Sequence, residues 1–200
     1  CRDRALLLTN ADGAQDYKIV ETPLGNPSRA NWCDLVPHRP GTLIKSFAVF
    51  APYLVQLALA DAQPRVVVRD LQSGAEHTVD PGSWESAAAD DPAYSLALLP
   101  GEEFETTTLR LAYSSPRTPR QTYDFDMATG TARLRKQQRV PSGHDPASYR
   151  VERRWVASHD DAQVPVTLLY RADAPPQAGR PLLLYGSGAY GMAVPASFSP

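Results

Sequence analysis

The residues that most suggest chemistry are three glycines near the end of the chain, Gly186, Gly188 and Gly191, which directly follow an apolar run. Glycine has no Cβ, so such a segment lets backbone N–H groups come close to a bound anion. The spacing matches the G-x-G-x-x-G loop that binds a dinucleotide pyrophosphate. A glycine loop can also stabilise the negative charge that develops on a substrate oxygen during acyl transfer.

The nucleotide interpretation of residues 186–191 requires a helix directly after the loop. Residues 192–200 contain Pro195 and Pro200 and show no helical apolar face. An acidic residue for the ribose, expected about 20 residues later, would fall beyond Pro200. The nucleotide-binding domain therefore stays an alternative, and the other use of these glycines is a loop that lines an active site.

Other reactive residue types show no chemical pattern. The four histidines, His38, His77, His144 and His159, have no metal-ligand spacing and are interpreted as turn or surface residues. No G-x-S-x-G nucleophile elbow occurs. The two cysteines form no C-x-x-C pair, so the sequence predicts neither a metal site nor a disulfide scaffold, and it mildly favours a reducing compartment.

The composition is that of a globular protein. The chain has 200 residues, of which 42% are hydrophobic and 21% charged, with a net charge of −2. This balance argues against disorder and against a nucleic-acid partner. The longest apolar stretch, 47–60, is too short and too interrupted to span a bilayer. Acidic residues predominate over 61–126, either as ordinary solvated turns or as a surface that attracts cationic substrates.

Short apolar runs separated by turn residues dominate the first 140 residues. Their length and their content of Val, Leu, Thr and Tyr predict β-strands. The runs are residues 5–8, 54–59, 65–68, 109–114 and 123–127. No helical periodicity extends over ten residues or more, so this part of the chain is predicted to be all-β.

An internal repeat sharpens that prediction. Asp70-Leu-Gln-Ser-Gly74 returns as Asp126-Met-Ala-Thr-Gly130, and the apolar run 54–59 returns as 109–113. Both features repeat at about 55 residues, a period that suits the four-stranded blade of a β-propeller. The alternative is a pair of unrelated hairpins that share ordinary turn residues.

The character of the sequence changes near residues 140–145. Beyond this Pro- and Gly-containing stretch lie the segment 149–157, a turn at 159–161, a predicted strand at 164–170 and the almost wholly apolar run 181–185. Continuous apolar character is typical of a strand buried on both faces in an α/β sheet. We therefore predict a propeller part over 1–143 and a second domain over 144–200.

At this point the sequence resembles a known family. The stretch Pro181-Leu-Leu-Leu-Tyr-Gly-Ser-Gly-Ala-Tyr-Gly191 is similar to the Leu-Leu-Tyr-Gly-Tyr-Gly-Ser-Tyr-Gly segment of the prolyl oligopeptidase family, above all in its oligopeptidase B (protease II) branch. Four further stretches resemble that branch in the same order along the chain: 32–39, 109–115, 149–155 and 164–171.

The resemblance implies a mainly β fold. Residues 1–143 would be the last blades of a seven-bladed β-propeller, and 144–200 the first strands of an α/β-hydrolase domain. It also implies a serine peptidase that cleaves short peptides after Arg or Lys, with a propeller that excludes folded proteins. The Ser–Asp–His triad would lie beyond Pro200. No cofactor, metal, nucleic acid or membrane is implied, and a cytoplasmic location is expected.

The resemblance also assigns candidate site residues. Gly186, Ser187 and Gly188 would form the oxyanion loop, and Tyr185 and Tyr190 would line the substrate pocket. Ser187 stands where the family has a tyrosine whose hydroxyl donates to the oxyanion. Losing such a donor typically costs about 3–4 kcal/mol. Three outcomes therefore stay open: compensation by Tyr185 or Tyr190, a slow enzyme, or a catalytically impaired relative that acts as a binding protein.

Overall fold

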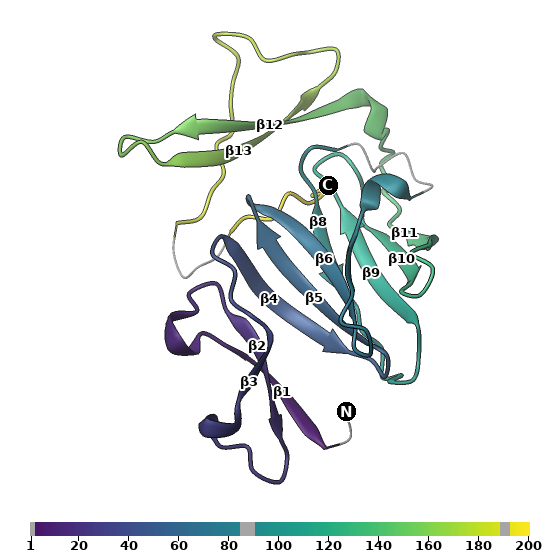
Figure 1. Cartoon of the computed structure of the whole chain (residues 1–200). Coiled ribbons are helices and arrows are strands. Elements are labelled where there is room, and N and C mark those ends of the chain that lie inside the picture. Colours follow the sequence, from purple (N-terminus) through teal and green to yellow (C-terminus); the bar gives the residue numbers. More distant parts are fainter. Residues whose placement is uncertain (1–2, 85–90, 189–192) are drawn as a thin grey trace. The chain divides into compact units, whose positions relative to one another are not determined.

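The computed structural model describes residues 3–84, 91–188 and 193–200 (Figure 1). By its internal contacts the chain forms two compact units. The first comprises residues 1–80, 98–110 and 125–131, and the second comprises 81–97, 111–124 and 132–200. This division does not follow the predicted domain boundary at 143, which stays a prediction.

β-Strands dominate the described residues. They are β1 (Arg4–Thr9), β2 (Lys18–Pro23), β3 (Cys33–Val36), β4 (Thr42–Val49), β5 (Tyr53–Ala60), β6 (Gln63–Asp70), β7 (Glu76–Val79), β8 (Ser95–Leu98), β9 (Thr108–Ser114), β10 (Gln121–Asp126), β11 (Ala132–Gln137), β12 (Tyr149–Ala157) and β13 (Gln163–Arg171). Four short 3₁₀ turns, η1 (Ala11–Gly13), η2 (Arg29–Asn31), η3 (Pro81–Ser83) and η4 (Pro146–Ser148), complete the described elements. The mainly β prediction is confirmed.

The strands form sheets in which neighbours along the chain are neighbours in the sheet. The sheet orders are β1-β2-β3, β4-β5-β6-β7, β11-β10-β9-β8 and β12-β13. Two consecutive four-stranded sheets are what the repeat of about 55 residues predicts for propeller blades. The repeated turns occupy the same place in both sheets, between the third and fourth strands. The alternative of unrelated hairpins is therefore wrong.

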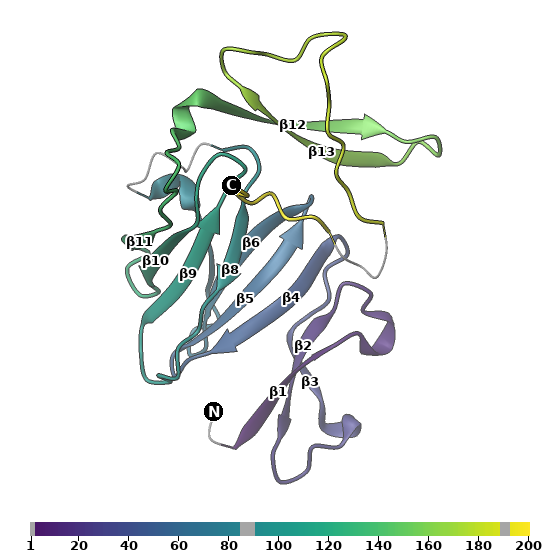
Figure 2. The ribbon, with the colours of Figure 1, turned by 180° about the vertical axis from the view of Figure 1, so that it is seen from behind.

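The sheet β4–β7 shows why these sequences form blades. β5 pairs antiparallel with both β4 and β6, as the neighbouring ribbons in Figures 1 and 2 show. Leu54 and Val55, adjacent residues that point to opposite faces, are both fully buried. Leu54 packs with Ile19, Val36 and Ile44 in the core of the first unit. An inner strand covered on both faces needs a nearly continuous apolar run, and 54–59 supplies it.

The Asp-to-Gly turns close the last hairpin of each four-stranded sheet. The Asp70 Oδ1 atom accepts the N–H groups of Gln72 at 2.8 Å and Ser73 at 2.7 Å. These bonds hold the pKa of the Asp70 carboxyl below its usual value, the Ser73 backbone N–H contributing most. Asp126 accepts two backbone N–H groups in the same way. Gly74 and Gly130 end the turns with φ of 74° and 73°, a conformation that favours glycine.

The second unit contains the hairpin β12–β13, paired in a continuous register from Tyr149↔Arg171 to Ala157↔Gln163. The prediction of a strand at 164–170 is confirmed. The predicted buried strand at 181–185 is wrong for this structure: residues 181–188 form no strand, and Leu183 is 89% exposed. A strand needs backbone partners, and no described residue pairs with this run.

We predict that Gly130→Ala destabilises the protein by about 1 kcal/mol, because alanine disfavours a positive φ. A Cβ at Gly130 would meet no atom within 4 Å, so the effect isolates backbone conformation. The measurement is urea unfolding followed by circular dichroism. The matched control is Gly25→Ala, in a loop position without positive φ and equally open. Equal effects of the two substitutions would contradict the role assigned to the turn.

Candidate functional site

The glycine segment singled out by the sequence lies in the second unit, downstream of β13. Gly186, Ser187 and Gly188 are exposed and in no regular element, and Tyr185 is 78% exposed. A Cβ at Gly186 or Gly188 would meet no described atom within 4 Å, and neither glycine has a positive φ. Neither local crowding nor backbone strain therefore accounts for glycine at these positions.

The structure does not assemble the predicted site residues into a pocket. Among the described residues, no hydrogen bond or ion pair joins Tyr185 or Ser187 to another side chain. Tyr190, the second pocket candidate, lies outside the described residues. Residues 193–200 contain no helix, so the nucleotide-binding alternative lacks the element whose N-terminus would hold a pyrophosphate.

The densest polar site of the second unit is a buried carboxylate. Asp91, whose side chain is 2% exposed, accepts a hydrogen bond from Arg117 Nε at 2.5 Å and one from the Ser115 hydroxyl. The Thr118 hydroxyl lies 3.4 Å from the same carboxylate. We name residues 114–118, the last residue of β9 and the turn that follows it, the Asp91 turn. Its backbone is closed by reciprocal bonds between Ser115 and Thr118.

The ring of Tyr113, which is close enough to Asp91 to feel its charge, packs in an aromatic cluster. Tyr94 stacks on Tyr113 with centroids 5.5 Å apart, and Trp84 meets Tyr113 edge-on at 6.1 Å. Burial raises the pKa of the Tyr113 hydroxyl well above its usual value, and the Asp91 carboxylate adds to that rise. Tyr113 therefore stays neutral at physiological pH. The sequence showed only an apolar strand followed by two serines and did not indicate this cluster, because Asp91 is distant from the turn along the chain.

His144 departs from the surface role that the sequence suggested. Its Nε2 lies 2.6 Å from the Arg117 carbonyl oxygen, to which it donates. Its ring stacks on Tyr149 with centroids 5.3 Å apart and meets Phe198 edge-on at 4.7 Å. The Phe198 N–H in turn donates to the Ser114 hydroxyl at 2.9 Å. Residues far apart in the sequence thus meet on the Asp91 turn.

The other three histidines fit the surface or turn interpretation better. His159 is exposed in the β12–β13 turn, and His77 is exposed on β7. His38 is partly buried, and its Nε2 accepts the Asp16 N–H at 3.3 Å. Among the described residues, no three His, Cys, Asp or Glu side chains gather as a metal ion would require. No helix in the described part of the chain is long and apolar enough to cross a membrane.

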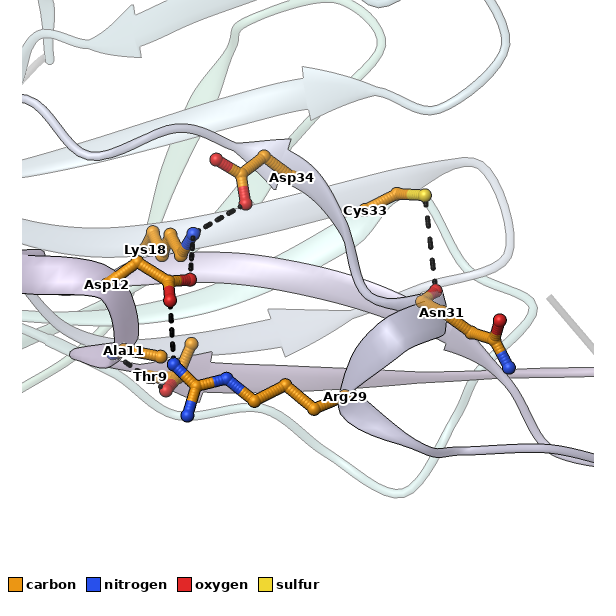
Figure 3. Close-up of polar contacts among 8 residues, drawn as sticks. All are labelled: Thr9, Ala11, Asp12, Lys18, Arg29, Asn31, Cys33 and Asp34. Atoms are coloured by element: carbon orange, nitrogen blue, oxygen red, sulfur yellow. Dashed lines mark hydrogen bonds and ion pairs between the residues drawn. The ribbon is translucent and has the colours of Figure 1, made fainter.

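A second charged cluster belongs to the first unit and joins β2, β3 and two 3₁₀ turns (Figure 3). Lys18 Nζ lies 2.9 Å from Asp34 and 3.3 Å from Asp12, and Arg29 lies 2.7 Å from Asp12. The Asp34 contact chiefly raises the pKa of Lys18, and the Arg29 contact chiefly lowers the pKa of Asp12. Two cations and two carboxylates balance, so this cluster is structural. Cys33 precedes Asp34 on β3, and its exposed thiol lies against the Asn31 carbonyl (Figure 3).

Comparison with known proteins agrees with this fold. Residues 2–138 match the family model described as "Prolyl oligopeptidase, N-terminal beta-propeller domain". The chain belongs to the prolyl oligopeptidase family. Dipeptidyl aminopeptidase BI of Pseudoxanthomonas mexicana is 38% identical over 98% of this chain and 26% of its own length. Protease 2 of Moraxella lacunata is 25% identical over 99% of this chain and 27% of its own.

Solved structures of the prolyl oligopeptidase family match along nearly the whole chain. Oligopeptidase B of Leishmania major superposes with a TM-score of 0.85 at 28% identity, covering 98% of this chain and 28% of that one. Oligopeptidase B of Trypanosoma brucei with covalently bound antipain gives 0.83 at 27% identity, with the same coverage. The chain thus spans about a quarter of the length of the relatives it matches. The propeller fold and family are confirmed.

We predict that Asp91→Asn destabilises the protein by about 3–5 kcal/mol, because it leaves the Arg117 cation in a mostly buried site without its carboxylate. The measurement is the shift in the midpoint of urea unfolding. The matched control is Asp173→Asn, which breaks an exposed ion pair with Arg171 and should leave the midpoint almost unchanged. Equal shifts would show that the Asp91 turn does not support the second unit.

Proposed function

We propose that this chain is part of a serine-type peptidase that cleaves short peptides by acyl transfer, with the propeller limiting substrate size. One observation carries the proposal: the likeness to peptidases continues beyond residue 138, where the propeller model ends. It covers residues 139–146, which we call the linker, the hairpin β12–β13 and the glycine segment. All the relatives compared above are peptidases.

The glycine segment supplies the part of the mechanism that these residues can perform. In acyl transfer a serine attacks the peptide carbonyl, and backbone N–H groups stabilise the resulting oxyanion. Gly186, Ser187 and Gly188 are exposed, and neither glycine is demanded by its own surroundings. Where neither crowding nor backbone conformation requires a small residue, a small residue still lets a substrate come close to the backbone. The nucleophile, acid and base would come from the rest of the peptidase.

Because Ser187 replaces a tyrosine, we expect this loop to stabilise an oxyanion less strongly than the corresponding loop of the family. A serine hydroxyl is too short to take the place of a tyrosine hydroxyl without a shift of the loop or a bridging water. Removing one oxyanion donor usually lowers the rate about 10²–10³-fold. The backbone N–H groups remain, so we propose a working but slow enzyme. Ser187 also motivates the second candidate, a catalytically impaired relative that binds peptides without cleaving them.

Two substrate preferences follow from the relatives. The resemblance to oligopeptidase B favours cleavage after Arg or Lys, and the acidic surplus over 61–126 would attract such cationic peptides. The higher identity to a dipeptidyl aminopeptidase favours removal of dipeptides from a free amino terminus. These preferences differ in whether a blocked amino terminus abolishes cleavage, so a single substrate series separates them.

Covalent labelling tests whether the peptidase is active. We expect a fluorophosphonate probe to label the complete peptidase that contains these residues, because the probe reacts with an activated serine. The matched control is Ser187→Ala: Ser187 is assigned to the oxyanion loop, so labelling should persist in this variant. Absence of label in the unchanged protein would favour the binding protein, and loss of label only in Ser187→Ala would identify Ser187 itself as the reactive serine.

A matched peptide series tests specificity. We expect substrates with Arg or Lys before the scissile bond to be cleaved at least tenfold faster, as kcat/KM, than otherwise identical substrates with Ala or Leu, which corresponds to ~1.4 kcal/mol. Each peptide is compared with a free and an acetylated amino terminus. Cleavage of both forms supports an oligopeptidase B-like activity, and cleavage of the free form alone supports a dipeptidyl aminopeptidase. Equal rates for basic and apolar residues would contradict the basic preference.

A further inference from the structure

The linker and the end of the chain meet at one point, the Asp91 turn. This turn is a rigid support, since Ser115 is fully buried and Thr118 is 4% exposed. The Ser114 hydroxyl is also fixed, because it donates to the Thr118 carbonyl at 3.0 Å. A carboxylate with several donors in a dry site resists displacement, because any opening leaves a buried charge unpaired. A segment of the chain that contacts this turn is therefore held in a fixed position.

The linker docks there through His144. Upstream, the Gln138 N–H donates to the Arg120 carbonyl at 2.8 Å, and downstream the His144 ring donates to the Arg117 carbonyl at 2.6 Å. Between these two attachments the linker borders a hollow of about 650 Å³. The hollow is lined by residues 137–141, His144, Pro146 and Pro119. An open space beneath the segment leaves it room to move once His144 is released.

The end of the chain docks on the same turn through Phe198. Its N–H donates to the Ser114 hydroxyl, and its ring lies edge-on to His144. Phe198 follows the glycine segment by a short stretch of chain, so this attachment limits where the downstream end of that segment can lie. The His144 ring, held between Tyr149 and Phe198, therefore joins the linker to the segment that follows the glycines.

We propose that His144 is a positioning residue. With Phe198 it forms a latch on the Asp91 turn. This latch couples the linker, residues 139–146, to the segment 193–200, which follows the oxyanion loop along the chain. The latch rests on the proposed function only in its consequence for catalysis, namely that loosening the linker displaces the oxyanion loop. The coupling itself is a property of the described contacts. Thermodynamic coupling is reciprocal, so a change at either end must loosen the other.

Three substitutions at position 144 separate the two contacts of the ring. His144→Ala removes both the donor and the ring. His144→Gln keeps an N–H donor of similar reach, and His144→Phe keeps a ring but loses the donor. The reciprocal variant is Phe198→Leu, a conservative apolar change near the end of the described chain. The matched control is His159→Gln, in an exposed turn that belongs to neither end of the latch.

Hydrogen exchange measured by mass spectrometry on the complete peptidase tests the coupling. We expect His144→Ala to speed exchange about fivefold to tenfold in both 139–146 and 193–200, as loss of a hydrogen bond and a ring contact implies. His144→Gln should restore much of the protection in 139–146. Phe198→Leu should speed exchange in 139–146, although position 198 lies outside that segment. Loosening confined to the substituted segment would overturn the latch.

Kinetics test the consequence for catalysis. We expect His144→Ala to lower kcat severalfold with KM within about twofold, since a displaced oxyanion loop weakens the transition state more than substrate binding. Partial rescue of kcat by His144→Gln would support positioning, and a KM rise with unchanged kcat would contradict it. If the unchanged protein has no peptidase activity, the proposed function fails, and the exchange experiment alone decides whether the latch exists.

Discussion

The second unit depends on the need to satisfy one buried charge. Asp91 is almost inaccessible to solvent, so its carboxylate must be met by donors, and Arg117, Ser115 and Thr118 provide them. Because these donors lie on one short turn, the turn has a single favourable conformation. Its carbonyl and hydroxyl groups then receive His144 and Phe198. The linker and residues 193–200 thus both contact a turn that this one carboxylate supports.

A second constraint shapes the blades. Each four-stranded sheet is a meander whose last hairpin must turn within a few residues, and in the first of these sheets the inner strand β5 is apolar and buried on both faces. The Asp70 and Asp126 carboxylates stabilise the tight turns of these hairpins in the same way, by accepting backbone N–H groups that the turn leaves unpaired. Repetition of this device in consecutive sheets makes the propeller architecture visible in the sequence and agrees with the matched family model.

The relatives of this chain in its family are peptidases, and the described residues suggest different roles for the parts of the chain. The blades are held by apolar packing and turn carboxylates, whereas residues 186–188 of the glycine segment are exposed and have no close neighbours that require glycine. Preorganised N–H donors stabilise an oxyanion only if they are held in place. The contacts of His144 and Phe198 suggest that the fixed point is a propeller turn and not the glycine segment itself. Catalytic geometry and the connection between the parts would then depend on the same contacts.

The sequence by itself determined the mainly β fold, the blade repeat with its turns, and the strands β1, β5, β6, β9, β10 and β13, because periodicity of apolar residues and Asp-to-Gly turns are local signals. It also indicated the family and the glycine segment. Only the tertiary structure showed that Asp91 is buried beside the turn at 114–118 and that His144 contacts Phe198, since these pairs are distant along the chain. The apolar run 181–185 shows the same limit. Its composition is that of a buried strand, but a strand also needs a neighbour, which composition alone does not reveal.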